Sequence, residues 1–125
     1  MLDAIGIACK SVDESVSFYS HFGLSFKKLG DGHYEGVSKS GLRIMLDSFE
    51  LMKTINPRWK EPGICGFTLC FKQSSVAEVN KLCALLTEAN YKVVKAPWDA
   101  FWGQRYASVL DPNGNQVDLF ADQPV

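Results

Sequence analysis

Residues 5–14 read IGIACKSVDE and residues 67–78 read FTLCFKQSSVAE, and this repetition decides the predicted fold. Each stretch holds a short apolar run that ends in lysine, and then a serine followed three residues later by glutamate. A serine N-cap with a glutamate at the third helical position is a capping box, which marks a helix start. The apolar spacing that follows predicts helices over 12–23 and 75–89. The chain is therefore predicted to begin the same strand–helix unit twice.

Three strand-like segments follow each predicted helix. They are 25–29, 33–37 and 42–47 in the first half, and 91–95, 104–110 and 115–120 in the second. The last two segments are joined by Asp111-Pro-Asn-Gly114, which is typical of a tight turn. Each half is thus predicted to fold as βαβββ. We divide the single domain, residues 1–125, into module one (1–47), a linker without periodicity (48–63) and module two (64–121).

The composition excludes several classes of protein. Hydrophobic residues make up 46% of the 125 residues and charged residues 22%, which is not the composition of a disordered chain. The formal net charge of −1 offers no electrostatic basis for binding nucleic acid or a membrane surface. No apolar run approaches the roughly 20 residues of a membrane span, and the first ten residues lack a basic signal region. We expect a cytoplasmic protein whose four cysteines are reduced.

Strand alternation assigns side chains to the two faces of each predicted sheet. Bulky residues of the first and fifth strands would meet the helices, so the small residues Ala4, Gly6 and Ala8, with Gly66, Thr68 and Cys70, would face the other way. Small residues beside polar ones leave room for a ligand, which predicts a cleft on this face. For strand 33–37 two registers remain open. Either His33 and Glu35 line the cleft, or Tyr34 and Gly36 do.

Two βαβββ modules that end in Asp111-Pro-Asn-Gly-Asn-Gln-Val-Asp118 resemble the vicinal oxygen chelate superfamily. This superfamily includes glyoxalase I, extradiol dioxygenases and the fosfomycin- and bleomycin-resistance proteins, and the bleomycin-resistance branch is the most similar. The resemblance covers nearly the whole chain. It implies an α+β fold in which the modules, related by a pseudo-twofold axis, form a curved mixed sheet around a cleft with the helices outside. It also implies a homodimer.

The resemblance further implies metal ligands at four positions, one pair in each module. Aligning Lys10 with Lys72 and the two turns with each other places these positions at Ala4, Met45, Gly66 and Asp118. Only Asp118 suits a hard divalent ion, and sites for such ions need three or more protein ligands. We therefore expect no metal site and no cofactor.

The side chains expected to bind a ligand are polar residues of the cleft face and aromatic residues of a loop before the seventh strand. They are Met45, Asp47, Trp98, Phe101, Trp102, Gln104, Tyr106, Ser108, Gln116 and Asp118. The leading hypothesis is a metal-free binding protein that sequesters an aromatic or cationic compound such as an antibiotic. The alternative is a metal-dependent lyase of the glyoxalase type or a dioxygenase. A metal-free enzyme with Asp118 or Glu35 as its base, and a ligand sensor with a protein partner, also remain open.

Overall fold

The computed structural model describes residues 1–63 and 66–125, and these form two compact units that divide after Gly63. The first unit holds module one and the segment predicted as a linker, and the second holds module two. Cys65 and the start of module two at residue 64 lie outside the described residues. Each unit is described below by itself.

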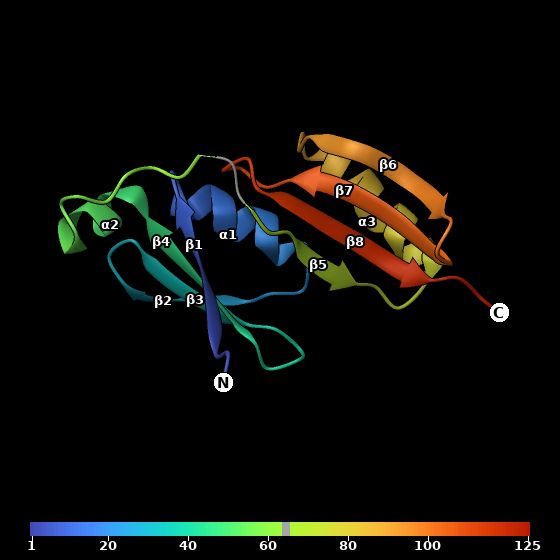
Figure 1. The fold of residues 1–125 in the computed structure, drawn as a ribbon, viewed down its shortest axis with the longest axis horizontal. Coiled ribbons are helices and arrows are strands. Elements are labelled where there is room, and N and C mark those ends of the chain that lie inside the picture. The colour runs from blue at the N-terminus through green and yellow to red at the C-terminus, as the bar shows by residue number, and fades with distance from the viewer. Residues whose placement is uncertain (64–65) are drawn as a thin grey trace. The chain divides into compact units, whose positions relative to one another are not determined.

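Module one has a mixed four-stranded sheet (Figure 1). Its elements are β1 Ala4–Cys9, α1 Val12–Ser20, β2 Phe26–Gly30, β3 His33–Val37, β4 Arg43–Ser48 and α2 Phe49–Ile55. The strand order is β1-β4-β3-β2, with β1 parallel to β4 and the other neighbours antiparallel. Phe18, Tyr19 and Leu46 are fully buried, so the core lies between α1 and the sheet.

Module two repeats this plan with another mixed sheet. Its elements are β5 Leu69–Lys72, α3 Val76–Glu88, β6 Val93–Ala100, β7 Gln104–Leu110 and β8 Gln116–Asp122. The strand order is β5-β8-β7-β6, and β5 runs parallel to β8. In Figure 1, α3 covers one face of this sheet, and buried Val79, Leu86 and Leu119 form the core there. The predicted α+β class and both βαβββ modules are confirmed.

The predicted helix starts are also correct. The hydroxyl oxygens of Ser11 and Ser75 accept hydrogen bonds from the backbone N–H of Glu14 at 3.3 Å and of Glu78 at 3.2 Å. The first helix ends at Ser20, three residues before the predicted end, since Phe22 and Gly23 continue only as turns. Among the described residues, no helix combines the length and the apolar character needed to cross a lipid bilayer.

Two segments differ from the expected structure. The predicted linker contains α2, which begins because the Ser48 hydroxyl caps the N–H of Leu51 at 3.0 Å. This helix was missed although Phe49, Met52 and Ile55 recur at helical spacing, because seven residues are too few for an apolar period to identify a helix. In module two, β6 continues to Ala100 and contains Trp98, which was expected in a loop. Pro97 is tolerated there because β6 is an edge strand with irregular pairing.

The strand registers correct the alignment of the two modules. Gly6 lies beside Met45, and Cys70 lies beside Asp118, so Gly6 corresponds to Cys70 and Ala4 to Thr68. The capping serines, Ser11 and Ser75, give the same offset. The alignment of Lys10 with Lys72 is therefore wrong by two residues, and Gly66 is not the counterpart of Ala4. Lys10 and Lys72 end similar apolar runs, and this similarity suggested an alignment that the strand pairing contradicts.

The remaining register questions have clear answers. His33 pairs with Asp47 and Glu35 with Met45, so His33 and Glu35 face away from the helices, as in the first of the two registers left open. In module two the backbone N–H of Asp111 donates to the carbonyl of Asn115 at 2.8 Å, and Val109 pairs with Val117 as predicted. Side chains at alternate positions of these strands therefore share one sheet face.

Candidate functional site

Asp118 is the polar centre of the sheet face of module two that is turned away from α3. Its carboxylate is 7% exposed and accepts three hydrogen bonds from neighbouring strand positions. The Tyr106 hydroxyl donates to Oδ2 at 2.7 Å, the Ser108 hydroxyl to Oδ1 at 2.8 Å, and Gln116 Nε2 to Oδ1 at 3.0 Å. These donors compensate the burial of the charge. Asp118 is thus held in place by its own sheet.

Tyr106 joins this polar centre to an array of aromatic rings. Its ring stacks on Phe120 at 5.7 Å between centroids and meets Trp102 edge-on at 5.3 Å. Burial, and then the hydrogen bond to the Asp118 carboxylate, raise the pKa of the Tyr106 phenol. The hydroxyl therefore remains a proton donor at neutral pH. Cys70 on β5 lies 3.8 Å from the same hydroxyl oxygen.

The turn between β6 and β7 carries the exposed part of this array. Trp102 meets Trp98 at 5.5 Å and Phe101 at 4.9 Å, both edge-to-face. Phe101 is 91% exposed and Trp102 is 48% exposed, so these rings present apolar surface to their surroundings. Gly103 has a φ of +91°, which a residue with a side chain rarely adopts, and it lets the turn close behind the two rings.

A polar chain fixes the orientation of Trp102. Its indole N–H donates to Gln104 Oε1 at 2.8 Å, and Gln104 Nε2 donates to Asp122 Oδ1 at 2.9 Å. Lys72 forms an ion pair with Asp122 at 3.0 Å. The hydrogen bond from Gln104 and the Lys72 ammonium together lower the pKa of Asp122. The exposed ring is thus positioned by three strands of the module.

The structure brings most of the predicted site together on this face, which we call the aromatic face. In module two it gathers Trp98, Phe101, Trp102, Gln104, Tyr106, Ser108, Gln116 and Asp118. Sequence reasoning missed Lys95, whose ammonium lies 4.0 Å from the centroid of the Trp98 ring, and Asp122, which holds Gln104. Phe120, which stacks on Tyr106, was not among the predicted site residues. Strand alternation alone could not have placed both Lys95 and Trp98 on this face, because they are three positions apart and a register shift lies between them.

Met45 and Asp47, the other two predicted residues, lie on the sheet of module one. They share a face with His33 and Glu35. The Asp47 carboxylate is paired with His33 Nδ1 at 2.5 Å, and Arg43 bridges Glu35 at 2.8 Å and Asp3 at 2.6 Å. The hydrogen bond from Arg43, followed by its charge, lowers the pKa of Asp3. This face is therefore polar, unlike the aromatic face of module two.

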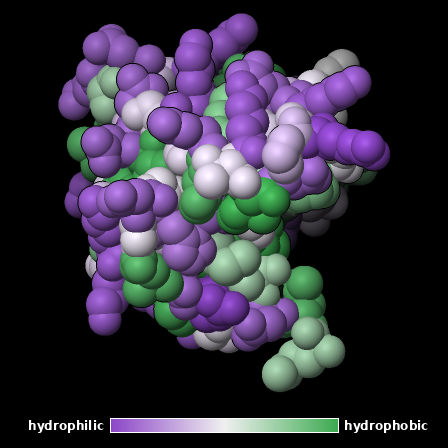
Figure 2. All heavy atoms as spheres, turned by 90° about the vertical axis from the view of Figure 1, so that its left-hand side faces the viewer, coloured by the Kyte–Doolittle hydropathy of each residue, from purple (hydrophilic) through white to green (hydrophobic). Residues whose placement is uncertain are grey.

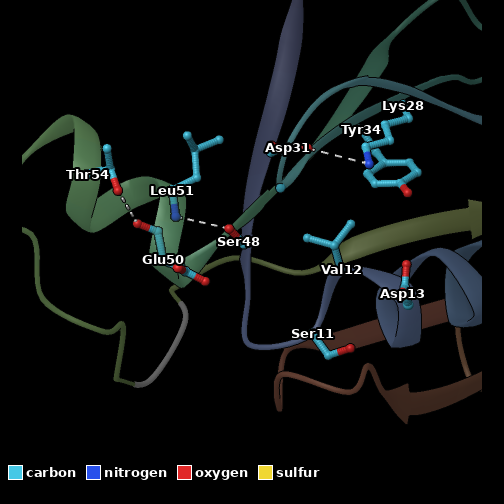
Figure 3. A pocket seen from close by; sticks show the side chains of 11 residues that line it. Ser11, Val12, Asp13, Lys28, Asp31, Tyr34, Ser48, Glu50, Leu51 and Thr54 are labelled. Carbon is cyan, nitrogen blue, oxygen red and sulfur yellow. Dashed lines mark hydrogen bonds and ion pairs between the residues drawn. The ribbon is translucent and has the colours of Figure 1, made fainter.

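Module one also has a cavity of about 660 Å³ on the other side of its sheet (Figure 3). It lies between the start of α1, the β2–β3 turn and α2, and Tyr34, Asp31, Glu50 and Asp13 contribute to its lining. The ammonium of Lys28, also in the lining, pairs with Asp31 at 3.6 Å. Figure 2 shows a mostly hydrophilic surface, with smaller apolar areas between the polar side chains. The predicted site residues lie outside this cavity.

The metal that the family resemblance implies does not fit the side chains at the corresponding positions. With the corrected alignment these are Ala4, Met45, Thr68 and Asp118. Ala4 has no ligating atom, Met45 offers a soft thioether, and both carboxylate oxygens of Asp118 already accept hydrogen bonds. Within residues 1–63 and 66–125, no group of three or more His, Cys, Asp or Glu side chains could hold a metal ion. We derive no chemistry through a metal at this site.

Two βαβββ modules, each with a helix on one face of a mixed sheet, define a protein of the two-module glyoxalase-like fold. A family model described as the Glyoxalase/Bleomycin resistance protein/Dioxygenase superfamily matches residues 1–119. The chain belongs to this superfamily.

Solved structures share the fold at low sequence identity. A glyoxalase-related enzyme from Fulvimarina pelagi has a TM-score of 0.85 at 15% identity and covers 98% of this chain and 88% of its own. A family enzyme from Burkholderia phytofirmans PsJN has a TM-score of 0.80 at 21% identity, covering 97% and 98%. Lactoylglutathione lyase from Agrobacterium tumefaciens has a TM-score of 0.71 at 18% identity, covering 97% and 92%. No curated protein matches the chain. These likenesses show the fold.

Proposed function

We propose that this protein binds a flat aromatic small molecule, such as an antibiotic, on the aromatic face of module two, and that it sequesters the molecule without making or breaking a bond. The observation that carries the proposal is the edge-to-face array of Trp98, Phe101, Trp102 and Tyr106, with two of its rings exposed. Aromatic side chains give a large contact area at a small cost in conformational entropy.

The polar neighbours favour a rigid site. Trp102 is anchored through Gln104, and Tyr106 through Asp118, so neither ring has to be ordered when the ligand binds. Such preorganisation increases affinity because less conformational freedom is lost on binding. Each aromatic contact contributes about 0.5–1.5 kcal/mol beyond its buried area. Two such contacts correspond to a gain in affinity of roughly fivefold to 150-fold, at about 1.4 kcal/mol per decade.

The proposed ligand is defined by its aromatic character and not by its charge. A cationic group was expected from Asp118 and Asp47. Both carboxylates are engaged by protein groups, Asp118 by three donors and Asp47 by His33. The proposal therefore rests on the rings. Assignment to the bleomycin-resistance branch is part of the same proposal. The alternative is a metal-dependent lyase or dioxygenase, which is disfavoured because the side chains at the implied ligand positions do not suit a metal ion.

The test is a fluorescence titration of the full chain against aromatic and glycopeptide antibiotics. Trp59 packs on Phe49 in module one, so a Trp59→Phe variant restricts the signal to Trp98 and Trp102. We expect quenching to survive in this variant, and Trp102→Ala to weaken binding at least tenfold while the protein stays folded.

Two results would overturn the proposal. One is equal binding of a hit by Trp102→Ala and by the parent chain. The other is a stoichiometric transition metal in protein purified without chelator, together with turnover that Asp118→Ala abolishes.

A further inference from the structure

The polar face of module one holds a pair of residues that ligand binding by module two does not use. His33 on β3 and Asp47 on β4 are directly opposite each other in the sheet, and His33 Nδ1 lies 2.5 Å from Asp47 Oδ1. Their side chains are 29% and 19% exposed. The remaining ring nitrogen, Nε2, has no hydrogen-bond partner within the described part of the chain. A carboxylate on one nitrogen fixes the tautomer in which the other nitrogen is a free acceptor.

The strand beside this pair carries only small side chains on the shared face. Ala8 is the neighbour of Asp47 on β1, and Gly6 is the neighbour of Met45. A Cβ placed on Gly6 would meet only the terminal methyl group of Met45, at 3.7 Å. The strand next to Asp47 therefore contributes almost no side-chain bulk to this face, and Met45 supplies an apolar surface. The other charged groups there are Glu35 and Asp3, which both pair with Arg43, and Lys27, which lies opposite Glu35 on β2.

We propose that His33 is a general base positioned by Asp47, and that module one hydrolyses small uncharged esters with short acyl chains. His33 Nε2 takes a proton from water while the water oxygen forms a bond to the ester carbonyl carbon. The ester C–O bond then breaks, and the proton passes from the imidazolium to the departing alkoxide oxygen. One ester and one water give one acid and one alcohol, and no other reactant is needed. Asp47 acts through His33 as a positioning residue.

The chain offers a matched control because it has two histidines. His21 lies at the end of α1 and outside this face. With p-nitrophenyl acetate as the probe, we expect the hydrolysis rate of the full chain above background to fall at least tenfold in His33→Gln. We expect it to stay within twofold in His21→Gln. Equal losses in the two variants, or no loss in His33→Gln, would show nonspecific surface catalysis and overturn the proposal.

A spectroscopic measurement tests the role of Asp47 even where activity is lost for other reasons. Nitrogen-15 NMR of the imidazoles should show the neutral form of His33 with its proton on Nδ1. In Asp47→Asn we expect a mixture of tautomers, with unchanged His21 signals and a hydrolysis rate several-fold below that of the parent. Retention of the Nδ1 tautomer and of the rate in a folded Asp47→Asn protein would overturn the positioning role. Loss of ligand binding on the aromatic face would leave both measurements unaffected.

Discussion

At the scale of single residues, Asp118 shows how a shared fold can hold a different chemistry. The side chain stands where the family resemblance implies a metal ligand, yet its two oxygens accept hydrogen bonds from a tyrosine, a serine and a glutamine. A carboxylate that accepts several hydrogen bonds has its charge compensated without a cation. The three donors come from alternate positions on the face that strand periodicity had already assigned.

Replacing Tyr106 by Phe should change how stability depends on pH. Because the pKa of Tyr106 is raised in the folded state, the folded protein keeps this proton at pH values where the unfolded chain loses it. This contribution to the free energy of unfolding is complete below about pH 10, the ordinary tyrosine pKa, and declines as pH rises towards the folded-state value. At pH 7 the variant should be less stable by about 1.5–3 kcal/mol, the range for a hydrogen bond to a charged group.

Urea unfolding of both proteins from pH 7 to pH 11 checks this expectation. The difference in the free energy of unfolding between parent and variant should shrink above pH 10. If the difference in the free energy of unfolding stays constant from pH 7 to pH 11, the hydrogen bond between Tyr106 and Asp118 does not raise the pKa of Tyr106 as described.

At the scale of elements, one side chain holds the turn between β7 and β8. The carboxylate of Asp111 is buried and accepts hydrogen bonds from the backbone N–H groups of Asn113 at 2.8 Å and Asn115 at 2.9 Å. It also accepts one from the side-chain amide of Asn115 at 3.0 Å. The turn therefore depends on one side chain, and not on the glycine alone.

Asp111→Ala should lower the free energy of unfolding by about 1.5–3 kcal/mol, because buried donors lose a charged acceptor. Asp111→Asn keeps an oxygen for the backbone donors and should lose less. Urea denaturation of both variants measures the two losses. Equal stability of Asp111→Ala and the parent would contradict the role given to this carboxylate.

The sequence predicts those features of the elements that depend on residues close together in the chain. The capping serines, the turn at Asp111 and the alternation of β7 and β8 involve neighbours in the chain, and they were predicted correctly. Three features depend on tertiary contacts that no local pattern encodes. They are the β1–β4 and β5–β8 registers, the continuation of β6 through Pro97, and the His33–Asp47 pair. The error of two residues in aligning the modules arose at such a register.

At the scale of the whole molecule, the two modules have the same strand order but present chemically different surfaces. Module one presents ion pairs on the sheet face turned away from its helix, and module two presents aromatic rings on the corresponding face. Strand alternation fixes which positions face outward but not what they carry. One strand order can thus present two chemically different surfaces.

We expect the chain to form a homodimer. Phe101 is almost fully exposed and Trp102 beside it is half exposed. Together they form an apolar surface of the kind that is buried in subunit interfaces. Light scattering at micromolar concentration should give twice the chain mass of 13.9 kDa, and Phe101→Ser should shift the equilibrium towards the single chain. A mass of one chain for the parent at this concentration would contradict the expectation.

The parallel pairing of β1 with β4, and of β5 with β8, has a consequence for synthesis on the ribosome. The first strand of each module emerges before its helix and two further strands, and its partner is the last strand to be made. Until then, the unpaired edge of the first strand is open to other partners, and pairing across so long a loop is slow. In module one that strand is AIGIAC, an apolar segment, so a nascent chain that stalls before residues 43–48 have emerged should be the species most prone to aggregate.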